Sequence, residues 1–585
     1  MLFDRIKSGY PGADEVFDSI RVGDNVVWQV TELSEYRLFA QPFADQAVKD
    51  GRNMVYIHFT RHEPLLSARP GLKIFEFDPD MGFEPFTVAI YNRITEEGPG
   101  TFYVFDCLSE LQSAWYTDQM MANFFRVTCP YLYELETVAY FPLLRSRHSF
   151  DSVARIRDTT QLLIDVYTSD SSVYIHTLKA QDREGNNIYI PHVSTHGGPF
   201  KPLDGGVAVS RYYRLLDDIS SHTQDQNYDS HDRFFAQAKM EFGRGQFRDE
   251  TERTILESMM SKDPNVQKLI HQMFDAKDYF AVRDRMIGSG SIGGKACGML
   301  LARKIAEECL PEFRDHAEPH DSFFIGSDVF YTYLVNNNCW KLRIEQRTPG
   351  GYFTKAPELR EAMLHCEFSA QIREQFRAML SYYGQSPIIV RSSSFLEDGF
   401  GNAFAGKYES VFCVNFGSPD ERLAAFEDAV RQVYASTMDP SALEYRRQRG
   451  LEQLDEQMSI LVQRVSGSWA GPYYLPGVAG VGYSRCLYRP SQDTDPEAGM
   501  LRLVVGLGTK AVDRTDDDYP RIVNLDRPAA RSHASTAERH RFSQHSVDVI
   551  DRERRQFRSV DCETVRQCLP GWFCNLMYEH DTDAE

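Results

Sequence analysis

A glycine-rich segment in the second half of the chain has the composition of an anion-binding turn. Residues 288–295 read GSGSIGGK and lead into a predicted helix over Ala296–Glu308. Glycines let backbone amides approach an anion, a helix N-terminus carries partial positive charge, and Lys295 adds a full charge. The glycine spacing differs from that of a Walker A loop, and alanine follows the lysine where Ser or Thr is needed. We therefore predict phosphate contacts at Gly293, Gly294 and Lys295.

A second segment carries an arginine and three serines at the end of an apolar strand. Residues 387–398 read PIIVRSSSFLED. An arginine on a buried strand suits bidentate phosphate binding, and the hydroxyls of Ser392 and Ser393 can donate to neighbouring oxygens. Alternatively, Arg391 is structural and forms an ion pair with one of the two acids that end the segment. Taken alone, the segment leaves both interpretations open.

Four further stretches follow in order. Residues 403–414 read AFAGKYESVFCV, in which a turn of small residues precedes Glu409. Residues 459–465 (SILVQRV) and 479–484 (AGVGYS), followed by 503–512 (LVVGLGTKAV), read as apolar strands bounded by turns and glycine. This pattern is typical of a twisted sheet that closes over a ligand.

The ordered series GGKA, VRSSSFLED, FAGKYES, YAST, EYRR, VQRV, AGVGYS and GLG resembles the N-terminal nucleotide-binding domain of phosphoenolpyruvate synthase and pyruvate phosphate dikinase. Water dikinases of glucan metabolism and rifampicin phosphotransferases share that domain. The resemblance covers about residues 271–525, under half of the chain. It implies a two-lobed ATP-grasp-like α+β fold that clamps ATP with Mg²⁺ and passes a phosphoryl group to a histidine on a mobile domain.

The resemblance also assigns roles by position. It implies that Lys295 and Arg391 are catalytic and hold the phosphates. The remaining residues that it places around ATP are Ser392 and Ser393, which line the pocket, Glu409 near the nucleotide, and Gln463 on the strand that faces adenine between the lobes.

The chain also departs from the family pattern. It reads Lys407-Tyr408-Glu409-Ser410 where family members usually read Gln-Gln-Glu-Thr. The late Gln-Asp-x-Glu motif that holds magnesium in the family is not found before Glu585, and neither a phosphohistidine domain nor a pyruvate-binding barrel is recognisable. We expect either a fragment of a longer protein or a chain that binds nucleotide without completing the dikinase cycle.

The first 215 residues read as alternating strands and helices, the pattern of a mostly parallel α/β layer. The order resembles a RecA-type ATPase, in which a strand and helix are followed by a strand ending in a magnesium-binding Asp, here Asp106. The link Thr31–Ser34, however, has no glycine and no lysine. We therefore expect a degenerate RecA-like domain without a phosphate loop, in which Asp106 is structural. The expected segments are the strands 26–30, 54–59, 101–107, 161–167 and 172–178, the apolar stretch 87–93, and a helix over 34–49.

We predict four parts: the RecA-like domain (1–215), a helical linker (216–270), the ATP-binding domain (271–525) and a C-terminal extension (526–585), which we treat as an incomplete part of the ATP-grasp lobe. The formal charge of −20 disfavours a nucleic-acid partner, and no apolar stretch is long enough to predict a membrane span. Eleven cysteines without CxxC pairs fit a reducing cytoplasm.

Three hypotheses follow for function. The first is an ATP-dependent phosphotransferase of the dikinase type, whose acceptor is a histidine carrier domain or protein supplied elsewhere. The second is a regulatory module in which a nucleotide-responsive clamp reports to a partner. The third, a P-loop ATPase in the N-terminal half, is disfavoured because the phosphate loop is missing.

Overall fold

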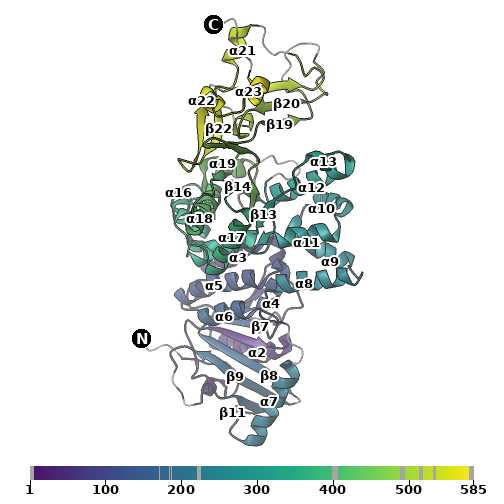
Figure 1. Cartoon of the computed structure of the whole chain (residues 1–585). Helices are drawn as coiled ribbons and strands as arrows, with labels where there is room; N and C mark the ends of the chain where they lie inside the picture. The colour runs from purple at the N-terminus through teal and green to yellow at the C-terminus, as the bar shows by residue number, and fades with distance from the viewer. Residues whose placement is uncertain are drawn as a thin grey trace.

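The computed structural model describes residues 5–169, 171–183, 185, 187–220, 225–397, 406–487, 494–512, 518–530 and 535–578. Asp398 and residues 403–405 of the predicted turn lie outside the described residues. Figure 1 shows an elongated molecule with a large sheet at one end, small sheets at the other, and helices packed on a middle sheet between them.

The N-terminal part is built on a nine-stranded sheet of order β11-β10-β9-β8-β3-β7-β6-β4-β5. The six strands from β8 to β5 in this order run parallel, and β9 to β11 add an antiparallel edge. The strands are β3 (Asn25–Val30), β4 (Met54–His58), β5 (Leu72–Glu76), β6 (Phe102–Phe105), β7 (Val138–Leu144), β8 (Leu162–Ser169), β9 (Ser172–Ala180), β10 (His192–Thr195) and β11 (Lys201–Pro202). A short hairpin, β1 (Arg5–Ile6) and β2 (Ile20–Arg21), precedes them. The predicted α/β class is confirmed.

Helices cover both faces of this sheet, which explains why its strands are apolar without alternation. On β3, Val27 packs on one face with Phe124, while Val26 and Trp28 pack on the other with Phe39. The helices of this part are α1 (Ala13–Val16), α2 (Leu33–Lys49), α3 (Phe83–Glu97), α4 (Leu108–Trp115), α5 (Asp118–Glu134), α6 (Phe150–Thr159) and α7 (Gly206–Ser220).

Several elements of this part were not predicted, and two of these differences have a clear physical reason. The stretch Thr87–Arg93 lies inside helix α3, whose buried positions Phe83, Phe86, Thr87, Ile90 and Ile94 follow the helical period. Strand β7 was not predicted. β7 contains Pro142, which pairs with Trp28 of β3 in the middle of the sheet. Proline is unfavourable in a central strand because it has no backbone N–H to donate to a neighbouring strand.

The middle part surrounds a five-stranded sheet of order β12-β13-β16-β14-β15. Its strands are β12 (Met286–Ile287), β13 (Ser322–Ile325), β14 (Ile388–Ser394), β15 (Ser410–Cys413) and β16 (Met458–Arg464). Only β12 and β13 pair in parallel. The helices are α8 (Ser230–Gly243), α9 (Asp249–Ile255), α10 (Pro264–Met273), α11 (Ala276–Asp284), α12 (Gly294–Cys309), α13 (Phe313–His316), α14 (Ser327–Asn336), α15 (Trp340–Arg347), α16 (Ala356–Leu364), α17 (Ala370–Tyr383), α18 (Pro419–Ala435) and α19 (Pro440–Gln448).

The two faces of the middle sheet have different covers. Leu461 packs with Ala296 and Leu300 of α12, together with Phe235 of α8 and Tyr279 of α11. Helices α8 to α11, which include most of the predicted linker, therefore pack on the same side as α12. On the opposite face, Val390 and Val462 join the helices α14 and α18 in the main core cluster.

The C-terminal part holds two small sheets. One contains β17 (Ser468–Ala470), β18 (Tyr473–Leu475), β22 (Ser546–Asp551) and β23 (Gln556–Asp561), and the other contains β19 (Ala479–Tyr483), β20 (Met500–Val504) and β21 (Arg521–Asn524). The helices are α20 (Thr509–Val512), α21 (Thr536–Arg541), α22 (Cys562–Arg566) and α23 (Gly571–Met577). Phe557 of β23 stacks on Phe412 of β15, with ring centroids 5.2 Å apart, which joins this part to the middle sheet. No described helix has the length and apolarity needed to cross a membrane.

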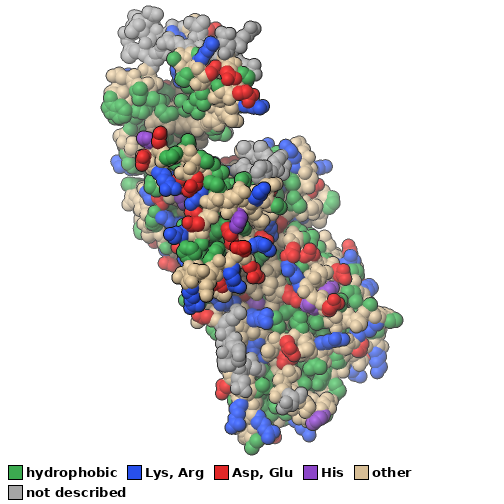
Figure 2. All heavy atoms as spheres, turned by 90° about the vertical axis from the view of Figure 1, so that its right-hand side faces the viewer, with side chains coloured by type: hydrophobic (Ala, Val, Ile, Leu, Met, Phe, Trp, Pro, Cys, Tyr) green, Lys and Arg blue, Asp and Glu red, His purple; other side chains and the backbone are tan. Residues whose placement is uncertain are grey.

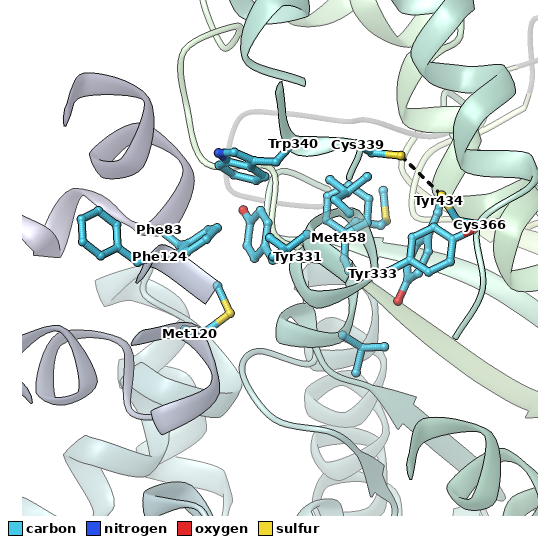
Figure 3. Close-up of a cluster of buried hydrophobic side chains, with 14 of the residues drawn as sticks. Phe83, Met120, Phe124, Tyr331, Tyr333, Cys339, Trp340, Cys366, Tyr434 and Met458 are labelled. Carbon is cyan, nitrogen blue, oxygen red and sulfur yellow. Dashed lines mark hydrogen bonds between the residues drawn. The ribbon is translucent and has the colours of Figure 1, made fainter. Parts of the chain in front are cut away.

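One hydrophobic core runs through the N-terminal and middle parts. Figure 3 shows Phe83 and Phe124 on one side of this core and Tyr331, Trp340 and Tyr434 on the other. The ring of Phe83 lies 5.0 Å from that of Tyr331 and 5.1 Å from that of Trp340, between centroids. Because these residues share one buried cluster, the N-terminal part depends on the middle part for packing.

A buried ion-pair network crosses the same boundary. Glu84 of α3 accepts hydrogen bonds from Arg343 Nε at 2.5 Å and from Arg347 Nη1 at 2.7 Å. Burial alone would raise the pKa of the Glu84 carboxyl, but the two guanidinium groups outweigh it and hold the pKa below its ordinary value. Each charge in this network therefore depends on its partners.

We predict that Glu84→Gln destabilises the whole protein by about 3–5 kcal/mol, because it leaves two arginines buried without a counter-charge. Urea unfolding followed by circular dichroism measures the loss. The control is Glu361→Gln, since Glu361 is an exposed residue of α16 whose partner His365 is also exposed. Equal midpoints for Glu84→Gln and the parent chain would contradict the prediction.

Candidate functional site

The predicted glycine turn is held tightly against strand β14. Gly293 has φ of +81°, and a Cβ atom on it would lie 1.5 Å from the carbonyl oxygen of Ser393. A Cβ atom on Gly294 would lie 1.9 Å from the carbonyl oxygen of Glu397. The two glycines are therefore required for backbone packing, whereas their contact with phosphate stays a prediction.

The tight packing places Lys295 over the end of β14. Its ammonium group donates to Ser392 Oγ and to Glu397 Oε1, both at 3.1 Å. Ser392 Oγ donates to the same carboxylate oxygen at 2.9 Å, and the Ser394 amide donates to the other oxygen at 2.8 Å. Of the two acids that end the predicted segment, Glu397 thus pairs with Lys295. The alternative interpretation of the sequence considered these acids only as partners of Arg391, and the pair with Lys295 was not predicted because it depends on the turn after β14.

Arg391 lies in the middle of β14, which continues to Ser394, and not at the strand's end as predicted. Its Nη1 atom lies 3.4 Å from Oε1 of Gln463 on the adjacent strand β16, and the Gln463 amide nitrogen lies 3.1 Å from the sulfur of Met299. Met299 follows Lys295 by one turn of α12, so both residues face the sheet from the same side of the helix. The structure therefore places Arg391 and Gln463 on the face of the β14–β16 pair that α12 covers, and binds Lys295 to Ser392, the residue that follows Arg391.

Two serines fix the start of helix α12 on this face. Ser393 Oγ accepts from the Ala296 amide at 3.0 Å and donates to the Ile292 carbonyl at 2.8 Å. Ser459 Oγ donates to the Ser291 carbonyl at 2.6 Å. Ser393 is fully buried and binds the first turn of α12, whereas its place in the pocket lining stays a prediction. Ser459 was not among the predicted site residues, since its contact with α12 is made only through the fold.

Glu409 lies at the edge of the same sheet. Its side chain is exposed, and its amide donates to Ser436 Oγ at 3.1 Å. The next residue, Ser410, pairs with Arg391 across β14 and β15. Glu409 is therefore next to the residue that pairs with Arg391, but none of the described contacts joins its carboxylate to Lys295.

Comparison with known families bears on this face. Residues 289–569 match the family model for the AMP/ATP-binding domain of pyruvate phosphate dikinase. The matched range contains every predicted site residue. It supports an ATP-binding, phosphotransferase-type domain and extends past residue 525 to include β22 and β23.

A large cavity lies elsewhere, between the N-terminal and middle parts. It has a volume of about 810 Å³ and is bounded on one side by Gly288 and Ser289 at the start of the glycine-rich segment. Its ionisable lining residues are Asp151, Asp229, Asp232, Asp328 and Glu367 against Arg155, Arg283 and His231. Carboxyl groups outnumber guanidinium groups in this lining, so we favour the Lys295 face for ATP.

The first strand–helix junction of the N-terminal sheet already holds an internal anion. Glu35 is buried, and its carboxylate accepts from the Thr31 amide at 2.6 Å and from Thr168 Oγ1 at 2.8 Å. Arg145 donates to Thr31 Oγ1 at 3.1 Å. The Glu35 carboxylate therefore accepts the hydrogen bond of the Thr31 amide, which a phosphate would accept in a phosphate loop. This agrees with the lack of glycine and lysine in the link Thr31–Ser34.

We predict that Gly294→Ala destabilises the α12–β14 junction, because the added methyl group would overlap the Glu397 carbonyl. The matched control is Gly298→Ala one turn later, where the added Cβ meets no atom within 4 Å. Since alanine is the better helix former by about 1 kcal/mol, Gly298→Ala should raise the melting temperature. Thermal unfolding measures both, and a Gly294→Ala melting temperature at or above that of Gly298→Ala would contradict the packing argument.

The acidic cavity should make stability depend on pH. Burial raises the pKa of Asp328 from 3.8 to about 7, and the hydrogen bond from Ser289 offsets this only in part. Between these values the folded chain holds a proton that the unfolded chain releases, so this group costs stability as pH rises from about 4 to 7. Asp328→Asn should therefore raise the melting temperature at pH 8 and have little effect at pH 4. Equal shifts at both pH values would contradict this origin.

Proposed function

We propose that the region 289–569 binds ATP and transfers a phosphoryl group to a histidine or another acceptor supplied outside the described residues. The family match carries this proposal. Arg391 and Gln463 share one face of the sheet and Lys295 binds the residue next to Arg391, which supports the same place for the nucleotide. Lys295 and Arg391 would neutralise phosphate charge, and the Gln463 carboxamide, five residues before β17, would meet the base near the C-terminal sheets.

The strongest physical support is the fixed position of the two cations. Lys295 is held by Ser392 and Glu397, and Arg391 projects from a strand that is paired on both sides. Preorganised donors stabilise the charge that develops during phosphoryl transfer without a cost of rearrangement. Lys295 uses two of its three N–H donors on Ser392 and Glu397, so the third can donate to a phosphate oxygen while the ion pair stays in place.

The residues of this face do not fit a built-in magnesium site. Glu397, the carboxylate beside Lys295, is 2% exposed and already accepts from the lysine, Ser392 and the Ser394 amide. Magnesium prefers exposed oxygen ligands and keeps several waters. We therefore assign no magnesium ligand, and we propose that the ion enters with ATP.

The N-terminal part is, in this proposal, a degenerate RecA-like domain that takes no nucleotide. Its support is the acid-filled junction at Glu35 and the order of strands around β3. The shared core that contains Phe83 and Tyr331 favours a second, regulatory candidate function, in which nucleotide binding in the middle part is felt by the N-terminal part. Acidic and basic side chains are interspersed over the face shown in Figure 2, which offers no broad basic surface to a nucleic acid.

We predict that Lys295→Ala and Arg391→Ala each weaken ATP binding roughly ten- to a hundredfold, since a charge-assisted hydrogen bond contributes about 1.5–3 kcal/mol. Calorimetric titration with MgATP measures the change. Adenosine has no phosphate, so its affinity should be unchanged in both variants.

The matched control is Arg303→Ala on the same helix, because Arg303 pairs with Glu307 away from β14. Circular dichroism checks that each variant is folded. If the folded Lys295 and Arg391 variants bind ATP as the parent and Arg303→Ala do, the proposed phosphate site is wrong.

A further inference from the structure

A histidine–carboxylate cluster lies at one edge of the N-terminal sheet, away from the proposed ATP site. His58 is the last residue of β4, and Asp106 directly follows β6. These strands are parallel neighbours, so their carboxyl ends meet at the same edge. His62 lies in the loop after β4, and Glu110 lies in the first turn of α4. Four chemistry-bearing side chains thus converge from three elements of the fold.

The spacing of the ligand atoms suits a metal ion. His58, His62 and Asp106 each offer one ligand atom, and these atoms all lie within 4.8 Å of one another. His62 Nε2 lies 3.7 Å from Asp106 Oδ2 and 3.4 Å from Glu110 Oε1. Nitrogen and oxygen ligands about 2.0–2.1 Å from zinc stand about 3.3–3.5 Å apart in a tetrahedron, and the 3.7 Å between the two ligands His62 and Asp106 is near that separation.

The cluster leaves buried polar atoms unsatisfied. The Nε2 atom of His62 and the Oε2 atom of Glu110 are buried and make no hydrogen bond. Asp106 and Glu110 bring two carboxylates within reach of the same imidazole nitrogen, and Asp106 is fully buried. Buried groups of this kind are normally satisfied by a partner. One dication would neutralise both carboxylates and take up the lone pair of His62.

The Asp106 carboxylate is already fixed by the fold around it. It accepts from the Phe59 amide at 2.7 Å and from the Tyr56 hydroxyl, which itself accepts from the Leu65 amide at 3.0 Å. His58 Nδ1 lies 2.6 Å from Asp106 Oδ2, and the ion would take the place of the proton that these two atoms share, while the Phe59 and Tyr56 contacts remain as outer contacts. Outer contacts of this kind orient the ligands of metal sites and raise their affinity.

We propose that His58, His62 and Asp106 bind one transition-metal dication of the zinc class, with Glu110 beside the open coordination position. The imidazole ligands select this class, because magnesium and calcium take oxygen ligands. The site is independent of the phosphate site at Lys295 and gives the N-terminal part a ligand of its own. In this proposal Asp106 binds a metal of the zinc class, and not the magnesium ion that the corresponding Asp binds in a RecA-type ATPase.

The test uses the full chain, stripped with a chelator and titrated calorimetrically with Zn²⁺ in the absence of nucleotide. We expect one ion per chain. His62→Ala and His62→Gln should each weaken binding at least a hundredfold, since each removes a ligand from a half-exposed loop without opening the core. The matched control is His196→Ala, an exposed histidine directly after β10 near the opposite edge of the same sheet, which should bind as the parent does.

Co²⁺ gives a second readout, because its visible absorption reports a low-coordinate site with imidazole ligands. The parent and His196→Ala should show that spectrum and the folded His62 variants should not, while an excess of Mg²⁺ should not displace the ion. Absence of stoichiometric Zn²⁺ binding in the parent would overturn the proposal. So would an ion that the His62 variants retain with parental affinity, or one that His196→Ala loses.

Discussion

The candidate site depends on the close approach of two backbones where helix α12 meets strand β14. Only glycine fits at positions 293 and 294, because any side chain would overlap the carbonyls of Ser393 and Glu397. This contact sets the start of α12 over the sheet and brings the Lys295 ammonium to Ser392 and Glu397. From there, one turn of the helix reaches Met299 above Gln463. The glycines therefore position the lysine whether or not their amides contact a ligand.

Electrostatics separates the three places where a nucleotide could be sought. The junction after β3 is closed by the Glu35 carboxylate, and the interdomain cavity has an excess of acids around Asp328. Only the face with Lys295 and Arg391 combines two fixed cations with the matched family range. The chain's overall negative charge does not conflict with this choice, because phosphate is recognised by local groups within a few ångströms.

Local patterns predicted much of this site, and long-range packing accounts for what they missed. The GGK turn, the strand with Arg391 and the strand with Gln463 were each visible in short stretches of sequence. The pairing of Glu397 with Lys295 was not, because it depends on how the turn after β14 folds back. Strand β7 was missed because Pro142 argues against a central strand, yet its neighbours supply the burial that holds it there. The cluster of His58 and Asp106 joins residues 48 positions apart through strand pairing, which no local pattern reveals.

The most direct test of the account is photolabelling of the full chain with an azido-adenine analogue of ATP, followed by mapping of the labelled peptides. The account predicts that label protected by excess ATP falls within residues 289–569, on peptides from α12 or from β16 around Gln463. Protected label on the peptide that contains Glu35, or on the Asp118–Asp151 segment beside the acidic cavity, would contradict it.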